Sequence, residues 1–224
     1  MNANMEFKTK LLFEENFEND LDQWWVEGQM DVFTNDHKIY VDIDKPGQNK
    51  GASGTVWLKQ KHPENFIITY NALVEQSGIG ANNINLFLCY NHPNDKPMIE
   101  SRDERESGAY NLYHELNGYI ITYLNDYDAD SGKYPDGSTK ARIRMRKNPG
   151  FNLVNEDYTY HCKQNNLYQF EIIKFKNKLI LRVDGEERLS WEDLDGPYGE
   201  GLIGLRTFQS KLYWEKFKLF KILD

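Results

Sequence analysis

The sequence of 224 residues lacks the features that define several large classes of protein. It has no apolar run approaching the roughly 18 residues that a membrane-spanning helix needs. Its formal net charge is −8, whereas proteins that bind nucleic acids usually carry a basic surplus. The sequence therefore indicates neither a membrane-spanning helix nor a nucleic acid as partner.

Cysteine is scarce, and the spacings typical of common cofactor and metal sites are missing. Cys89 and Cys162 are too few for a disulfide framework and fall in or beside predicted strands, so we expect two buried free thiols. The histidines show no zinc-ligand spacing. The chain also has no glycine-rich phosphate loop before a helix and no serine nucleophile elbow. We therefore expect no cofactor.

The N-terminal residues Met1 to Lys10 lack the apolar core of a signal peptide. Two locations stay open. The protein is cytoplasmic if the sequence is taken as it stands, and periplasmic or secreted if a signal peptide precedes it in the native protein. No pattern in the sequence indicates an oligomeric state.

Short alternating segments recur along the whole chain. No segment keeps an apolar stripe of helical period for three turns. At least ten segments alternate between apolar and polar residues, with Gly, Asn, Asp and Pro clusters between them. They are Lys38–Asp44, Thr55–Lys61, Phe66–Leu73, Ile84–Tyr90, Tyr119–Asn125, Lys140–Lys147, Tyr168–Lys174, Lys178–Asp184, Leu202–Phe208 and Leu212–Ile222.

This pattern predicts one all-β domain. There is no internal repeat and no flexible linker, and sandwiches of this length occur as single domains. We predict an antiparallel two-sheet β-sandwich, a jelly roll of the concanavalin-like lectin and glucanase type. It would span residues 13–224 after an N-terminal tail of residues 1–12. Asp184-Gly185 predicts a tight hairpin turn.

Two long polar segments interrupt the strands. The first, Asn91 to Gly108, is highly charged, and a loop of that length in a small domain is usually functional or disordered. The second, Asp126 to Gly137, begins with an Asp-x-Asp-x-Asp pattern like that of a calcium loop. Its Gly132 stands at position 7 instead of 6, and position 12 is Gly instead of Glu. A structural calcium ion here is the one metal site that the sequence leaves open.

The most distinctive local pattern is the segment Lys140–Lys147. Because side chains alternate along a strand, Arg142, Arg144 and Arg146 should share the face opposite Ile143 and Met145. Neighbouring guanidinium groups about 6.6 Å apart repel by roughly 2.5 kcal/mol at an effective dielectric near 20. Bidentate binding of a carboxylate or sulfate would offset that repulsion. The alternative is a solvated face neutralised by the chain's many carboxylates.

Tyrosine and histidine side chains precede this segment. Tyr110, Tyr113, His114 and Tyr123 lie close to it in the sequence, in a stretch that we interpret as strands. In β-elimination a base removes the proton next to a uronate carboxylate, and a cation stabilises the developing negative charge. Arginines beside Tyr and His supply these parts. A lone histidine, however, often makes only a structural hydrogen bond.

Aromatic residues make up 14% of the chain. Strands favour aromatic side chains, so β-propensity alone is one explanation. The other is a sugar-binding surface on which flat rings stack against pyranoses. Trp25 and Trp57 are candidates for this stacking, or equally for the core, and Arg206 is a candidate for the anion site.

A glycosidase would instead need two carboxylates at a defined separation. Candidates occur in and near the two long loops, but none has the strand spacing that would place two carboxylates on one face of a sandwich. They are Glu100, Asp103, Glu104, Glu106, Glu115 and Asp126.

The sequence also resembles a known group of proteins. The segments that carry the resemblance are Gly54–Trp57, Ser107–His114, Arg142–Phe151 and Gly201–Arg206. They resemble a bacterial domain-of-unknown-function family of concanavalin-like proteins that are encoded among polysaccharide-utilisation genes, including those for rhamnogalacturonan. The similarity covers about Phe13 to Ile222. It implies a sandwich fold and a carbohydrate context, but no particular reaction.

These observations lead to one main expectation and two alternatives. We expect an enzyme that acts on acidic oligosaccharides, uronate-containing and in some cases sulfated, by β-elimination, as a lyase or a dehydratase. His114 with Tyr110, Tyr113 or Tyr123 would move protons, while the arginines hold the anion. The alternatives are a glycoside hydrolase that uses loop carboxylates and a non-catalytic carbohydrate-binding module.

Overall fold

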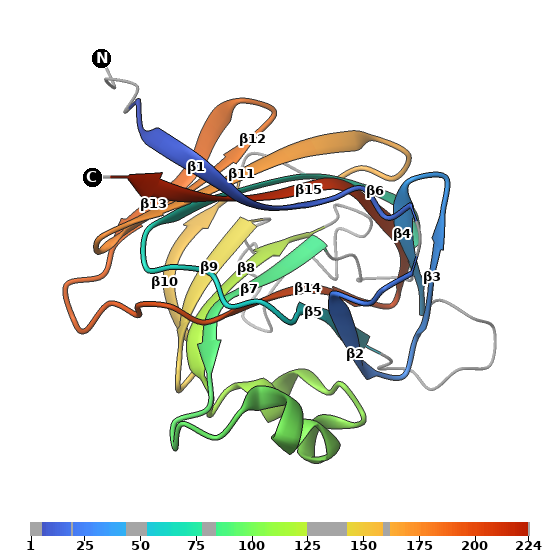
Figure 1. Cartoon of the computed structure of the whole chain (residues 1–224), viewed down its shortest axis with the longest axis horizontal. Coiled ribbons are helices and arrows are strands. Elements are labelled where there is room, and N and C mark those ends of the chain that lie inside the picture. The colour runs from blue at the N-terminus through green and yellow to red at the C-terminus, as the bar shows by residue number, and fades with distance from the viewer. Residues whose placement is uncertain are drawn as a thin grey trace.

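Two antiparallel β-sheets pack face to face, as the sequence predicted (Figure 1). The structure is a computed structural model that describes residues 6–18, 20–43, 53–77, 84–124, 143–158 and 162–223. Residues far apart in the sequence lie side by side in both sheets, because several of the paired strands are not consecutive in the chain. The first and last strands also pair, so both ends of the described chain lie together (Figure 1).

The first sheet has seven strands. In spatial order they are β10 (Asn152–Asp157), β9 (Ile143–Asn148), β8 (Asn117–Tyr123), β7 (Ile84–Asn91), β14 (Leu202–Phe208), β5 (Ser53–Leu58) and β2 (Trp24–Gly28).

The second sheet has eight strands. In spatial order they are β13 (Glu186–Glu192), β12 (Lys178–Val183), β11 (Leu167–Phe175), β6 (Phe66–Ser77), β15 (Ser210–Leu223), β4 (Lys38–Asp42) and β3 (Asp31–Asn35), and β1 (Lys8–Glu15) pairs with β15 beside them. Residues 8–12, which we had assigned to an N-terminal tail, are therefore part of this sheet.

The core lies between the sheets and follows the predicted alternation. Ile143 and Met145 of β9 point into it, while Arg144 and Arg146 lie on the opposite face of the strand. Cys89 and Cys162 are free and buried, as expected. Alternation thus fixes which side chains of each strand face the core and which remain for another role.

The predicted hairpin turn is confirmed between β12 and β13. Asp184 and Gly185 both have positive φ angles, 53° and 80°. Two successive residues in this region form the two-residue turn whose twist matches that of paired strands.

A segment of irregular and 3₁₀ structure joins β7 to β8. We call residues 92–116 the cover segment. It contains the 3₁₀ helices η1 (Met98–Arg105) and η2 (Tyr110–Tyr113). Figure 1 shows it in green against the face of the seven-stranded sheet that points away from the eight-stranded sheet. We call that face the outer face.

The interpretation of Ser107 to His114 as a strand is wrong. Gly108 turns the chain with a φ of 64°, and η2 follows. Side chains three residues apart share one side of a 3₁₀ helix, so Tyr110 and Tyr113 both point toward the sheet. Among the described residues, the structure has no helix that is long and apolar enough to cross a membrane.

Candidate functional site on the outer face

Strand register arranges the outer face of the seven-stranded sheet into two neighbouring rows of side chains. Each row takes one residue from each of six adjacent strands, and the rows are two residues apart along the strands. The aromatic row consists of Trp25, Trp57, Gly204, Phe87, Ile120 and Arg146; the polar row consists of Glu27, Thr55, Arg206, Asn85, Thr122 and Arg144.

The cover segment buries most of the aromatic row. Trp57 is fully buried, with the ring of Tyr113 at 6.3 Å and that of Phe87 at 5.7 Å. Met98 and Leu116 of the cover segment belong to the same apolar cluster. This half of the face is therefore a second, smaller core between the sheet and the cover segment.

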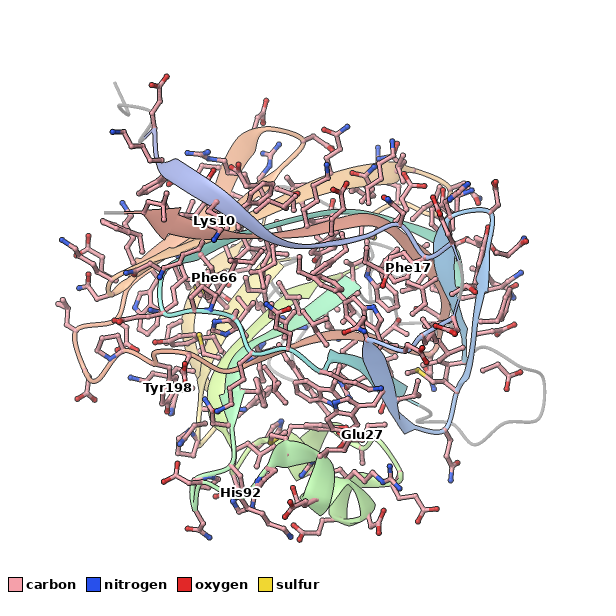
Figure 2. The ribbon with its side chains drawn as sticks, viewed as in Figure 1. Lys10, Phe17, Glu27, Phe66, His92 and Tyr198 are labelled. Carbon is pink, nitrogen blue, oxygen red and sulfur yellow. The ribbon has the colours of Figure 1, made fainter. Side chains whose placement is uncertain are left out.

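One buried ion pair fastens the cover segment to the sheet. The guanidinium of Arg105 lies 2.7 Å from the carboxylate of Glu27, and both side chains are at most 3% exposed. The same carboxylate accepts hydrogen bonds from Trp57 Nε1 at 2.9 Å and from the Tyr113 hydroxyl at 2.8 Å. Figure 2 shows Glu27 where the strand meets the cover segment. Both oxygens of the Glu27 carboxylate therefore accept hydrogen bonds that join the sheet to the cover segment or brace that contact.

Arg206 lies at the centre of the polar row and is 1% exposed. Its guanidinium donates to Thr55 Oγ1 at 3.0 Å, to Ser53 Oγ at 3.0 Å and to the carbonyl oxygen of Gly108 at 2.7 Å. The rings of Phe87, Tyr110 and Tyr113 surround it at about 5 Å. All of these neighbours are neutral at neutral pH.

Among the described residues, the positive charges of the polar row have no carboxylate partner. Within the described part of the chain, no carboxylate lies within 4.0 Å of Arg206 or Arg144, in contrast to Arg105. A buried guanidinium without a counter-charge costs on the order of several kcal/mol. This arrangement favours an anion at the row.

Three atoms of the polar row are buried and have no hydrogen-bond partner in the described part of the chain. They are the Nε atoms of Arg144 and Arg206 and the Oδ1 atom of Asn85. Asn85 pairs directly with Arg206 on one side and with Thr122 on the other, and Thr122 pairs with Arg144. Buried polar groups are usually satisfied. Such neighbouring unsatisfied donors and acceptors are typical of a place that receives a polar ligand or water.

A compact group of side chains borders the row. The imidazole of His114 stacks on Phe151 with ring centroids 4.0 Å apart, and the guanidinium of Arg146 lies 4.3 Å from the same ring. Tyr110 stands edge-on to His114 at 5.2 Å. Its hydroxyl lies 3.4 Å from Thr122 Oγ1. The structure thus brings together the predicted residues Tyr110, His114 and Arg146.

The surroundings of His114 lower its pKa. Burial, together with the charges of Arg146 and Arg206, lowers the pKa of His114, and Glu115 opposes this only in part. Its Nε2 atom is buried and has no hydrogen-bond partner among the residues that the structure describes. A neutral imidazole with an unoccupied nitrogen can accept a proton or a hydrogen bond from a ligand.

The predicted role in proton transfer is wrong for two of the three tyrosines. Tyr123 is fully buried and faces the sandwich core, with its ring against Tyr168 and Phe170. Tyr113 is also fully buried, and its hydroxyl is committed to Glu27. Burial is the main reason why the pKa of Tyr113 is raised. Tyr110 is the remaining candidate of the three.

The two tryptophans have different surroundings. Trp57 cannot stack on a sugar, because it is fully buried beneath the cover segment. Trp25 is 9% exposed, stacks on Trp57 with centroids 5.7 Å apart and lines a cavity at the end of the aromatic row. The predicted sugar contact is therefore wrong for Trp57 and stays a prediction for Trp25.

Several other predicted residues lie outside the site or outside the described residues. Arg142 and the Asp126–Gly137 loop, with its candidate calcium ligands, belong to the part of the chain that the structure does not describe. The described residues contain no group of three or more His, Cys, Asp or Glu that could hold a metal ion. The remaining carboxylates considered for hydrolysis are exposed and lie on the cover segment, not in the polar row; they are Glu100, Asp103, Glu104, Glu106 and Glu115.

Sequence reasoning missed the parts of the site that depend on strand register. Asn85 and Thr122 lie in segments that were correctly predicted as strands, but only the paired register places them beside Arg206 and Arg144. Alternation in Trp24–Gly28 could have placed Glu27 on the same face as Trp25. Arg105, the partner of Glu27, lies in the cover segment, where no sequence pattern indicated that its side chain is buried.

The chain belongs to the family called Domain of unknown function (DUF1961), whose model matches residues 10–214. This agrees with the resemblance to a domain-of-unknown-function family. A search of curated proteins found no match.

Solved structures with the same fold include several lectin-like proteins. A protein of unknown function with a galectin-like fold from Bacillus subtilis has a TM-score of 0.78 at 20% identity, covering 97% of this chain and 99% of that one. The exoplasmic/lumenal domain of VIP36, in a form bound to Ca²⁺ and Man3GlcNAc, has a TM-score of 0.62 at 13% identity, with coverages of 97% and 92%. The carbohydrate-binding module CBM66 from Bacillus subtilis has a TM-score of 0.55 at 12% identity, with coverages of 87% and 93%.

These likenesses confirm the predicted sandwich fold. At such low identity they identify neither ligand nor reaction for this chain.

Proposed function

We propose that this protein binds an acidic saccharide at the polar row of the outer face, in the context of bacterial polysaccharide use that the family resemblance implies. The observation that carries the proposal is the buried guanidinium of Arg206, which has no carboxylate partner in the described chain. An anionic ligand would supply the missing negative charge. Two lectin-like structures that share the fold, one with a bound oligosaccharide, support a carbohydrate as the ligand class.

The other groups at the row suit a sugar acid. Asn85 and Arg144 offer an acceptor and a donor that are not otherwise used, as hydroxyl and carboxylate groups require. Tyr110 and His114 are half-buried at its margin, so they can contact a ligand whose charged end reaches the arginines. Arg146, above Phe151, adds a third positive charge to those of Arg206 and Arg144.

Binding is tested by comparing acidic and neutral oligosaccharides of equal length by isothermal titration calorimetry. Oligogalacturonates and their carboxyl-reduced forms make such a pair. Arg144→Ala should weaken binding of the acidic form by about tenfold or more, since a hydrogen bond to a charged group contributes about 1.5–3 kcal/mol. Binding of the reduced form should change little.

Arg182→Ala is the matched control. Arg182 also lies on a strand, but on the eight-stranded sheet, where it pairs with Glu171 at 2.7 Å. The Arg182→Ala variant therefore removes a positive charge, as Arg144→Ala does, but from the other sheet. Equal losses for the acidic and the neutral ligand in Arg144→Ala, or equal losses in both variants, would contradict the proposed role of the row.

Elimination is a second candidate function, which the Nε2 atom of His114 favours, because it is buried and has no hydrogen-bond partner among the described residues. His114 would take the proton next to the uronate carboxylate, while Arg206 and Arg146 stabilise the negative charge that develops. A C=C double bond would form as the neighbouring C–O bond breaks. Tyr110 would protonate the leaving oxygen, which departs as a sugar hydroxyl in a lyase or as water in a dehydratase.

Mass spectrometry and ultraviolet absorbance of the unsaturated product test this candidate. Chain cleavage with a new double bond indicates a lyase, and loss of one water without cleavage indicates a dehydratase. His114→Gln and Tyr110→Phe should each abolish the product and leave ligand binding within a few-fold of the wild type. Cleavage with gain of water would instead indicate hydrolysis, and an unaltered ligand that still binds would leave a binding module.

A further inference from the structure

A cavity of about 480 Å³ lies at the Trp25 end of the aromatic row. Its volume is in the usual range for a small-molecule site. We call it the Trp25 pocket. Its apolar lining includes Trp25, Met98 and Leu202, from β2, the cover segment and β14. The pocket uses none of the residues of the polar row.

The charges around the Trp25 pocket oppose the net charge of the protein. Lys59, Lys61 and Lys96 line it, against one lining carboxylate, Asp95. The whole chain carries −8. His92 also lines the pocket and lies in the connection between β7 and η1 (Figure 2). A local excess of positive charge in a concave site raises the local concentration of anions.

The lysines of the pocket are only weakly engaged with the protein. Lys96 lies 3.0 Å from Glu104, and Lys61 lies 3.9 Å from Glu200, but all four side chains are at least 39% exposed. Exposed pairs of this kind contribute little, so a ligand anion can compete with them. Lys59 donates to the backbone carbonyl of Asp22, which leaves its positive charge without a carboxylate in that contact.

Trp25 supplies a wall that suits a sugar ring. Trp57 lies nearly parallel to it, at an interplanar angle of 19°, and fixes the indole in place. The C–H faces of a pyranose are apolar and pack on such a rigid aromatic side chain, while a carboxylate or sulfate on the ring can reach an ammonium group. An apolar wall with cationic groups therefore fits an acidic sugar unit better than a neutral or purely apolar ligand.

We propose that the Trp25 pocket is a second subsite for acidic saccharides, separate from the polar row. The inference rests on the proposed function, because it assigns the same ligand class to a second place. The lining of the pocket includes none of the six residues of the polar row, so a ligand unit bound in the pocket contacts a different set of side chains. The chain then engages an acidic oligosaccharide at two points, which raises its avidity.

The test is a titration of ¹⁵N-labelled protein with tetragalacturonate, followed through the indole signals of the tryptophans. We expect the Trp25 signal to shift, with an affinity that falls about tenfold, or ~1.4 kcal/mol, in Lys61→Gln/Lys96→Gln. The matched control is Lys211→Gln/Lys218→Gln on the eight-stranded sheet. Lys218 is 39% exposed and lies 3.0 Å from Glu14, as Lys96 does from Glu104. The control should bind as the wild type does.

Three results overturn the inference. They are a Trp25 signal that does not move, an unchanged affinity in the pocket variant, and equal losses in both double variants. Arg144→Ala separates this failure from failure of the proposed function. If Arg144→Ala loses affinity while the pocket variant does not, the polar row binds alone. If the pocket variant loses affinity while Arg144→Ala does not, the pocket binds and the function proposed for the polar row is wrong.

Discussion

Arg105 and Arg206 are two buried arginines near the ring of one tyrosine, and their polar partners differ in charge. Their guanidinium groups lie 5.8 Å and 4.8 Å from the ring of Tyr113. Arg105 has a carboxylate partner, Glu27, whereas the contacts of Arg206 are hydroxyl groups, a carbonyl and aromatic rings. The comparison separates a charge that holds the fold together from a charge that we propose is available to a ligand.

His62 is another buried basic side chain, and it is neutral at neutral pH. His62 is 1% exposed, accepts a hydrogen bond from the Cys89 amide and lies against the ring of Phe66, with centroids 4.2 Å apart. Burial lowers the pKa of His62 to about 4. A buried base can thus be paired, neutral or charged without an acid, and the last state is the costly one. That cost makes Arg206 informative about function.

We expect the largest loss of stability when the carboxylate partner of Arg105 is removed. Glu27→Gln leaves the Arg105 charge buried and unpaired, so we expect the free energy of unfolding to fall by about 3–5 kcal/mol. Chemical denaturation measures it. Glu171→Gln is the control, because its pair with Arg182 has the same 2.7 Å distance but is 20% and 35% exposed. It should cost about 1 kcal/mol or less. A similar loss of unfolding free energy in both variants would show that the buried Glu27–Arg105 pair stabilises the fold no more than the exposed pair does.

The neutral base should make stability depend on pH. The ordinary pKa of histidine is 6.5 and that of His62 in the folded protein is about 4, so between these values the unfolded state binds more protons. Acid therefore favours unfolding. Between about pH 7.5 and about pH 4.5 this residue alone should remove roughly 2.5 kcal/mol. His62→Gln should lose that part of the pH dependence; parallel pH profiles for variant and wild type would show that His62 is not the cause.

Arg206, which has no carboxylate partner among the described residues, should make stability depend on anions. A ligand that binds only the folded state at a hundred times its Kd stabilises it by about 2.7 kcal/mol. We expect oligogalacturonate to raise the unfolding free energy of the wild type in this way and to have much less effect on Arg206→Met. Arg182→Met should respond as the wild type does. Equal stabilisation of all three proteins would place the bound anion elsewhere.

Alternation along strands was enough to predict the sandwich and the facing of the arginine strand. Ile143, Met145, Arg144 and Arg146 lie on the predicted sides. Tyr123 was misplaced because its role was inferred from closeness in sequence, although its alternation with Ile120 and Thr122 puts it in the core. Local patterns give the face of a residue, not its neighbours in other strands.

The cover segment could not be predicted for a different reason. Its charged sequence resembles a solvated loop, yet Arg105, Met98 and Tyr113 are buried against the sheet. Burial of Arg105 depends on Glu27, which is 78 residues away in the chain. Such long-range pairs leave no periodicity in the sequence. For the same reason the wall of the Trp25 pocket, shared between strands and the cover segment, was not foreseen.

The polar row takes its six side chains from β2, β5, β7, β8, β9 and β14, which span most of the chain. A molecule that bridges Arg144 and Arg206 would therefore act as a clamp across strands that form separate parts of the chain. Its effect on amide hydrogen exchange would not stop at the contacted residues. Amide exchange in β9, β8, β7 and β14, which are adjacent in the sheet, would slow together. Opening any one of these strands would first require the ligand to be released.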